Sequence, residues 1–266
     1  MTGFPGQMAG VAGLVALYMT AWFAVALVRK DNSVADIAWG LGFVLVAAVT
    51  FSRRSALVPP LLVTALVAAW GTRLAVHILL RNRAKGEDPR YAAWRRQWGR
   101  SFVWRSYFQV FLLQGLFMVV ISSPVVLVNT APSSPRPALA AWLAGSAVWA
   151  VGFVFEAVGD AQLARFKRDP ANKGRIMDRG LWRYSRHPNY FGESLMWWGI
   201  FLAALGTPGG WMTVASPALL TFLLVRVSGV PMLERRYAGN AEFQAYARRT
   251  NAFVPGPPRK APAAEP

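Results

Sequence analysis

The 266-residue chain contains no cysteine and only two histidines, His77 and His187. The absence of cysteine excludes disulfide bonds, thiolate nucleophiles and cysteine-based metal sites. Two histidines are too few for a multi-histidine metal centre, so no metal site is expected. Charged residues are also scarce, at 15% of the chain, against roughly 25% in soluble domains. Together with a hydrophobic content of 55%, this scarcity excludes an ordinary soluble domain.

The hydrophobic residues gather in seven stretches with the length, or nearly the length, of a transmembrane helix, which needs about 20 residues. The stretches are Met8–Val28, Ala35–Phe51, Leu57–Leu80, Tyr107–Val128, Ala138–Val158, Tyr190–Leu205 and Trp211–Val230. The second and the sixth are short, which leaves six spans as the alternative count. The sequence therefore predicts an all-α, polytopic membrane helix bundle with about seven transmembrane helices.

The predicted bundle forms a single domain, residues 1–254, because no stretch inside it resembles a linker between two cores. Residues 255–266, with the sequence PGPPRKAPAAEP, are predicted to be a disordered tail.

Acidic residues are the scarcer charged class, with 12 Asp and Glu against 29 Lys and Arg. If the N-terminus lies outside, most of the basic residues fall in cytoplasmic loops and the C-terminal tail, as the positive-inside rule requires. The C-terminus is therefore expected in the cytoplasm. Topology and attraction to anionic lipid head groups account for much of the net charge of +17. Binding to nucleic acid is not expected, since no recognition module is present.

Polar residues that could take part in binding or catalysis cluster between residues 153 and 193. Glu156 and Asp160 are four residues apart and share a helical face at the cytoplasmic end of the fifth stretch. Polar groups at membrane depth are costly and indicate a partner or a function. A solvated helix end is the structural alternative for this pair.

A polar turn follows the fifth stretch. Pro170 and Gly174 interrupt the helix on either side of Asn172 and Lys173, whose donors suit an anion. The same loop carries guanidinium groups suited to phosphates; these belong to Arg175, Arg179, Arg183 and Arg186. Each arginine alone is typical of a membrane interface, but their density in one loop favours a polyanionic ligand such as a dinucleotide.

The segment RYSRHPNYFGE, residues 183–193, opens the next helix at Pro188. Asn189 and Glu193 lie four residues apart on one face and suit hydrogen bonds to a carboxamide or to ribose hydroxyls. Helix capping is their alternative role. His187, beside Arg186 at the helix start, is expected to contact a ligand, with a structural histidine as the alternative.

This segment resembles the carboxy-terminal signature of the steroid 5-α-reductase and sterol-reductase superfamily. More closely, the segments DNSVADIAWGLGF, RNRAKGEDPRY, FKRDPANKGRIMDRGLWRYSRHPNYFGE and VSGVPMLE together resemble the bacterial steroid-5-α-reductase-like proteins of the DUF1295 family. The resemblance covers nearly the whole chain. It implies a seven-helix enzyme of the bacterial inner membrane that binds NADPH on the cytoplasmic face. It also implies reduction of an activated carbon–carbon double bond in a lipophilic, steroid-like or isoprenoid-like substrate.

The resemblance further assigns ligands of NADPH. Asp160 matches the family's dinucleotide-binding aspartate, and Asn189 and Glu193 match its asparagine and glutamate. Arg73 matches the arginine of the third span, and Asn82 matches its asparagine after a one-residue shift. The residues expected at the cofactor are Arg73, Asn82, Asp160, Lys167, Asn172, Lys173, Arg175, Tyr184, Arg186, His187, Asn189, Tyr190 and Glu193.

The substrate half departs from the steroid reductases. Those enzymes resemble one another in a Gln-Glu pair on the second span and a Tyr on the third. This chain has no Gln-Glu pair there; its second span offers Asp36 and Trp39, and Trp70 fills the tyrosine position of the third span. A steroid itself is therefore not the expected substrate. The candidates for the catalytic acid are Asp36 and Glu156, followed by Tyr91 and His77.

Asp36 suits the role of the acid because an apolar site can hold a carboxylic acid neutral, so that it donates a hydrogen bond. Its alternative roles are to cap the second helix or to pair with a basic loop residue. The nearby segment GEDPRY, Gly86 to Tyr91, is either an ordinary charged loop or a cover that folds over the cofactor.

The main alternative function is an S-adenosylmethionine-dependent methyltransferase of the isoprenylcysteine or phospholipid type. Such enzymes resemble this chain in an Arg-His-Pro-x-Tyr-x-Gly motif, and Glu234 matches a downstream glutamate. Asp160, Lys167 and the arginine-rich loop favour a phosphorylated dinucleotide over a positively charged sulfonium. A lipid-binding or scaffold protein without catalysis is a third interpretation. The expected partners are a lipophilic small molecule and membrane lipids.

Overall fold

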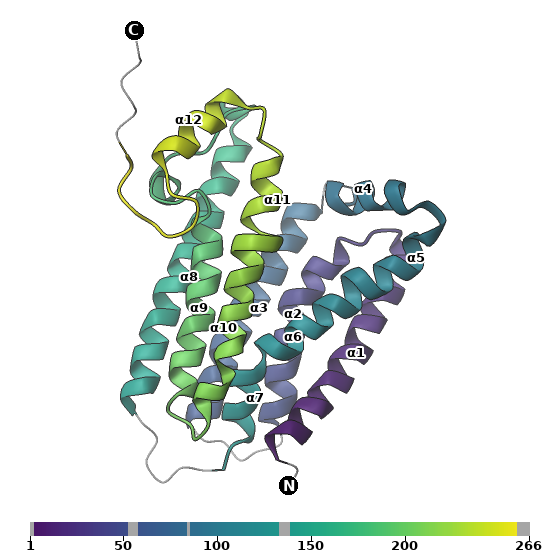
Figure 1. The fold of residues 1–266 in the computed structure, drawn as a ribbon, viewed down its shortest axis with the longest axis vertical. Helices are drawn as coiled ribbons and strands as arrows, with labels where there is room; N and C mark the ends of the chain where they lie inside the picture. Colours follow the sequence, from purple (N-terminus) through teal and green to yellow (C-terminus); the bar gives the residue numbers. More distant parts are fainter. Residues whose placement is uncertain (1–2, 53–57, 84–85, 133–138, 260–266) are drawn as a thin grey trace. The chain divides into compact units, whose positions relative to one another are not determined.

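The computed structural model describes residues 3–52, 58–83, 86–132 and 139–259 (Figure 1). Within these ranges the regular structure is helical and contains no strand; the sole β-type pairing there is an isolated bridge between Ser185 and Asn251. The prediction of an all-α protein is confirmed.

The chain groups into two compact units. Unit 1 comprises Met1–Trp142 and Ala204–Ser216, and unit 2 comprises Leu143–Ala203 and Pro217–Pro266. The candidate site residues are divided between the two units. The single domain, residues 1–254, remains a prediction.

Unit 1 is built mainly from the first seven α-helices. They are α1 (Phe4–Arg29), α2 (Val34–Phe51), α3 (Val58–Asn82), α4 (Pro89–Trp98), α5 (Phe102–Arg105), α6 (Leu113–Ile121) and α7 (Ser123–Thr130), with a π-helical segment at Ser106–Leu112. Glycines allow α2 and α3 to pack closely, since a Cβ atom on Gly40 would lie 2.6 Å from the carbonyl oxygen of Gly71. Phe43 and Trp70 fill the buried space between these helices with an edge-to-face ring contact.

Unit 2 contains most of α8 (Leu139–Arg168) and α9 (Pro188–Ala204), the larger part of α10 (Ala215–Phe222), and all of α11 (Val230–Arg235) and α12 (Ala241–Arg249). Helices α8 and α9 run side by side (Figure 1). A Cβ atom on Gly192 would lie 2.5 Å from the carbonyl oxygen of Gly152, and one on Gly199 would lie 2.6 Å from that of Gly145. Small residues thus bring the two backbones together, as in many membrane helix pairs.

Among the described residues, six helical stretches are long and apolar enough to cross a membrane. They are Phe4–Arg29, Val34–Phe51, Val58–Asn82, Pro89–Ile121, Leu139–Arg168 and Gly210–Arg235. The chain is therefore a polytopic membrane helix bundle, as predicted. The predicted sixth span falls on α9, which has 17 residues. The total of seven spans and the orientation of the termini remain predictions.

The segment after α12 makes defined contacts. The backbone N–H of Gly256 donates to the carbonyl of Tyr184 at 3.0 Å, and that of Arg259 donates to the carbonyl of Arg249 at 2.8 Å. Residues 255–259, which belong to the tail predicted to be disordered, thus include two backbone hydrogen-bond donors to the preceding chain, and the disorder of the tail remains a prediction. The rest of that prediction, residues 260–266, lies outside the described residues.

Candidate functional site

A carboxylate on α8 fixes the side chain of Asn189 in the first turn of α9. The amide nitrogen of Asn189 donates to Oδ1 of Asp160 at 3.1 Å. Because an ionised carboxylate only accepts hydrogen bonds, this contact settles which way the amide points. The amide oxygen, Oδ1, is then a buried acceptor with no hydrogen-bond partner among the described residues. Such an atom suits a ligand that offers an N–H or O–H group.

A second carboxylate holds His187, which precedes α9. Nε2 of His187 lies 3.1 Å from Oε1 of Glu234 on α11. The ring is only 5% exposed and stacks on Tyr190 at 5.5 Å between centroids and 8° between planes. Its other nitrogen, Nδ1, is buried and has no partner within the described part of the chain. Near the start of α9, Oδ1 of Asn189 and Nδ1 of His187 are therefore both buried without a hydrogen-bond partner among the described residues.

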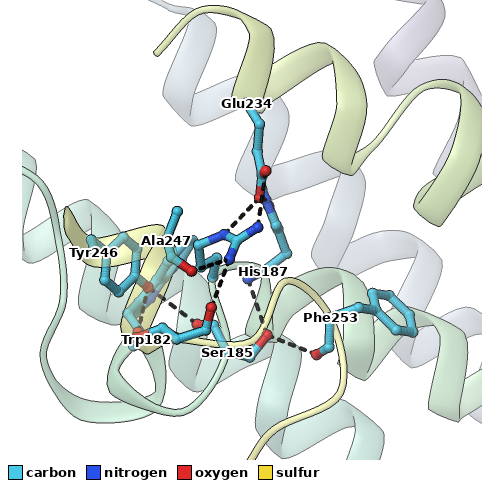
Figure 2. A network of polar contacts seen from close by, with 9 residues as sticks. Trp182, Ser185, His187, Glu234, Tyr246, Ala247 and Phe253 are labelled. Carbon is cyan, nitrogen blue, oxygen red and sulfur yellow. Dashed lines mark hydrogen bonds and ion pairs between the residues drawn. The ribbon is translucent and has the colours of Figure 1, made fainter. Parts of the chain in front are cut away.

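Arg186 forms an intramolecular clamp, and its partners Glu234 and Ala247 are labelled in Figure 2. Its Nε and Nη2 donate to the two carboxylate oxygens of Glu234 at 2.8 and 3.0 Å. Its Nη1 donates to the carbonyl oxygens of Ala247 at 3.0 Å and of Thr250 at 2.6 Å. The guanidinium thereby ties α11 and the end of α12 to the segment before α9. These four bonds use four of the five N–H donors of the guanidinium, so a phosphate at Arg186 could take only the remaining one without displacing a partner.

Further bonds fasten the end of the chain to the same segment (Figure 2). The hydroxyl of Ser185 donates to the carbonyl of Phe253 at 2.7 Å and accepts from the backbone N–H of His187 at 3.1 Å. The hydroxyl of Tyr246 donates to the carbonyl of Trp182. Burial raises the pKa of the Tyr246 phenol, which keeps it a donor at neutral pH. Neither Ser185 nor Tyr246 is among the residues predicted from the sequence. The spacing of Tyr246 from Phe243, three residues apart on an amphipathic helix, is a signal from which the burial of Tyr246 could have been predicted.

The loop between α8 and α9 exposes a set of basic side chains. They are Lys173, Arg175, Arg179 and Arg183; the exposed Arg165, Lys167 and Arg168 at the end of α8 add to the same set. The loop is anchored by an ion pair between Asp178 and Arg249 and by the backbone N–H of Ile176, which donates to Glu242 at 3.2 Å. The exposed side chains supply a positive surface suited to phosphates.

Asn172 has a structural role in this loop. Its amide donates to the carbonyl of Phe166 at 3.1 Å and to the carboxylate of Asp169 at 3.3 Å. These bonds satisfy a carbonyl at the end of α8 and hold the short 3-10 turn Pro170–Asn172. The predicted contact of Asn172 with a cofactor would compete with them.

Glu156 and Glu193 are buried on α8 and α9, at 3% and 8% exposure. The backbone of Glu156 lies against Gly192, where an added Cβ atom would be 2.5 Å from its nitrogen. Tyr184, by contrast, is 44% exposed and lines an apolar groove with Phe155, Leu181 and residues 255–257.

Two of the predicted cofactor ligands, Arg73 and Asn82, lie on α3 and belong to unit 1; the others belong to unit 2. Oδ1 of Asn82 accepts from Nε of Arg81 at 3.3 Å. The amide nitrogen of Asn82 is buried without a hydrogen-bond partner in the described ranges. Asn82 thus offers a donor, whereas Asn189 offers an acceptor.

The candidates for the catalytic acid, Asp36 and Tyr91, are in direct contact in unit 1. Oδ2 of Asp36 accepts from Nη2 of Arg90 at 2.7 Å, and Oδ1 accepts from the hydroxyl of Tyr91 at 2.7 Å. Asp36 therefore pairs with a basic loop residue, which is one of the alternative roles predicted for it. Tyr91 is only 2% exposed, and Asp36 fixes the position of its hydroxyl.

The segment from Gly86 to Tyr91, whose last three residues begin α4, is fastened to the segment that leads into α2. Glu87 binds Arg95 with two hydrogen bonds of 2.7 and 2.9 Å and accepts from the backbone N–H of Asn32 at 2.9 Å. The backbone N–H of Asp88 donates to the hydroxyl of Ser33 at 2.7 Å. These bonds hold Arg90 and Tyr91 against Asp36. That the loop covers a cofactor remains a prediction.

Comparison with known proteins identifies a family. A family model described as "Protein of unknown function (DUF1295)" matches residues 22–250. No curated protein and no solved structure matches the chain. The matched region includes Asp36, Arg90 and Tyr91 as well as the residues around Asn189 and His187.

Proposed function

Because the chain belongs to the DUF1295 family, whose function is unknown, we propose from its own residues that it is a membrane-embedded, NADPH-dependent reductase. The observation that carries the proposal is the contact between Asp160 and Asn189, which leaves the amide oxygen of Asn189 as a buried acceptor. The proposed reaction reduces an activated carbon–carbon double bond of a lipophilic molecule that enters from the bilayer.

The residues present in unit 2 fit a dinucleotide. The carboxamide, the adenine amino group and the ribose hydroxyls of NADPH all provide the donors that Oδ1 of Asn189 lacks among the described residues. The exposed basic side chains between α8 and α9 suit its phosphates. When bound, NADPH supplies the hydride. The protein binds and orients the cofactor through these contacts.

We assign the acid to Tyr91. Reduction of an activated double bond adds a hydride to one carbon and builds negative charge on the conjugated oxygen, which a hydrogen-bond donor stabilises. The hydroxyl of Tyr91 has a single hydrogen, which it gives to Asp36 in this structure. As the acid, it turns this hydrogen to the substrate oxygen, while Asp36, itself paired with Arg90, stays beside it. Asp36 accepts with both oxygens in this arrangement, so it acts on the reaction through Tyr91. The buried carboxyl of Glu156 is the second candidate.

One observation favours the methyltransferase alternative. The two parts of the motif that resembles isoprenylcysteine and phospholipid methyltransferases, Arg186 with His187 and the downstream Glu234, are in contact. The charge of the ligand separates the two functions, because S-adenosylmethionine carries a positive sulfonium and no phosphate. An exposed loop with so many basic side chains attracts the phosphorylated ligand and repels the sulfonium.

The test is direct binding to the detergent-purified protein. NADPH, NADH and S-adenosylmethionine are compared by thermal shift and by quenching of tryptophan fluorescence. The reductase proposal requires that NADPH raise the Tm and that Asn189→Ala weaken its binding. Asn129→Ala is the matched control, since Asn129 of unit 1 is also buried with an unpartnered amide oxygen among the described residues. Saturable binding of S-adenosylmethionine without a response to NADPH would instead support the methyltransferase.

A further inference from the structure

We propose that Glu234 is a positioning residue, which fixes the hydrogen of His187 on Nε2 and makes Nδ1 an acceptor for an amino or hydroxyl group of the bound dinucleotide. The second half of this inference rests on the proposed function. Its first half concerns the ligand-free protein alone, so the two are tested separately.

The contact between Glu234 and His187 sets the tautomer. Oε1 of Glu234 lies 3.1 Å from Nε2 of His187. An ionised carboxylate has no hydrogen to donate, so the hydrogen in this bond belongs to Nε2. In a neutral imidazole with Nε2–H, the other nitrogen carries a lone pair and accepts. In the neutral form of His187, Nδ1 is therefore the accepting atom of the ring.

Other bonds keep Glu234 and the ring in register. Arg186 binds both carboxylate oxygens of Glu234 and also the carbonyls of Ala247 and Thr250, so the carboxylate is held at two points. The ring of His187 is stacked on Tyr190, and its backbone N–H donates to Ser185. These contacts hold one face of the ring, its Nε2 edge and the backbone of His187. The ring therefore has little freedom to flip and swap the positions of its two nitrogens.

Nδ1 is buried and has no hydrogen-bond partner among the described residues. A buried acceptor without a donor costs free energy, which a ligand with an N–H or O–H group recovers on binding. Phosphate oxygens accept at neutral pH and do not meet this need. His187 therefore selects the adenine amino group, the carboxamide or a ribose hydroxyl, and the basic loop is left to bind the phosphates.

The experiment is nitrogen NMR of the detergent-solubilised protein labelled with 15N-histidine. The chain has only two histidines, and His77→Gln assigns the signals of His187. We expect a single tautomer with Nε2 protonated in the ligand-free wild type. Glu234→Gln, whose amide both donates and accepts, should give a mixture of tautomers. Glu242→Gln is the matched control, because Glu242 accepts from the backbone of Ile176 in the same unit and should leave the spectrum unchanged.

The ligand arm adds saturating NADPH. The Nδ1 signal of His187 should move as the atom accepts a hydrogen bond, and Glu234→Gln should raise the Kd about tenfold, the loss of roughly one such bond. A wild-type spectrum with Nδ1 protonated, which is read without any variant that has to fold, overturns the positioning role. An identical tautomer in Glu234→Gln does the same.

If NADPH binds and the Nδ1 signal stays in place, the acceptor role is wrong while the reductase proposal survives. If NADPH does not bind the wild type at all, the proposed function fails and the acceptor role fails with it. The ligand-free spectra still decide whether Glu234 positions His187.

Discussion

Asp160 holds the amide nitrogen of Asn189 at 3.1 Å and so turns the amide oxygen of Asn189 into a buried acceptor. The close approach of α8 and α9 makes this contact available, since glycines on both helices leave no side chains between the backbones. Glu234 on α11 likewise binds one polar atom of His187, the ring nitrogen Nε2. In both cases a carboxylate on another helix, Asp160 on α8 or Glu234 on α11, binds one polar atom of the side chain and leaves the other without a partner among the described residues.

The first prediction concerns this acceptor. Asn189→Ala removes the amide oxygen, and Asp160→Asn removes the fixed acceptor that orients it. Each substitution should raise the Kd of NADPH about tenfold, corresponding to roughly 1.4 kcal/mol, the scale of one hydrogen bond. Titration by tryptophan fluorescence measures the effect. Equal affinity in wild type and Asn189→Ala would remove Asn189 from the cofactor site.

The second prediction separates two arginines that are alike in sequence. Arg175 is exposed, so Arg175→Gln should weaken NADPH binding and make it less sensitive to salt while the Tm stays unchanged. Arg186 is bonded to Glu234 and to two carbonyls. Arg186→Gln should therefore lower the stability by about 3 kcal/mol, because Glu234 loses its cationic partner and keeps only its contact with His187. Tm measurements and NADPH titrations at two salt concentrations test both variants; a stable Arg186→Gln with impaired binding would reverse the assignment.

The third prediction concerns the acid. Tyr91→Phe should lower kcat by about 10²–10⁴, the usual contribution of a positioned acid, and leave the Kd of NADPH unchanged. Asp36→Asn should lower kcat less, since the hydroxyl remains but loses its fixed partner. NADPH oxidation with lipophilic enones is the assay. Tyr18→Phe is the control, because Tyr18 donates to the carbonyl of Ala38 in the same unit. Full activity of Tyr91→Phe would shift the assignment to Glu156.

The fourth prediction concerns the packing of α8 and α9. A methyl group on Gly192 would press against the backbone of Gly152 and of Glu156. Gly192→Ala should destabilise the protein by about 1–3 kcal/mol, as overpacking does. Gly10→Ala on α1 is the control, since nothing lies within 4 Å of its added methyl group; it should be neutral or gain about 0.5–1 kcal/mol. Equal changes of Tm in the two variants would contradict the close packing of α8 against α9 at Gly192.

The sequence by itself determined the helical class, the membrane location and the family. Long apolar runs can satisfy their backbone hydrogen bonds in a bilayer only as helices or closed barrels, so composition and length were sufficient for the class. Local spacing also placed Asp160 on α8 and Asn189 at the start of α9, because a motif of a few residues fixes its own helical register.

The tertiary structure alone decided what the charged residues bind. Arg186 meets Glu234, 48 positions along the chain, and Asp36 meets Arg90 and Tyr91 at separations of 54 and 55. A guanidinium fork fits a phosphate and a carboxylate equally well, so residue type could not distinguish a ligand contact from an internal clamp. Only the packing that brings α11 and α12 to the start of α9 shows that Arg186 is engaged within the protein, whereas Arg175 lies exposed.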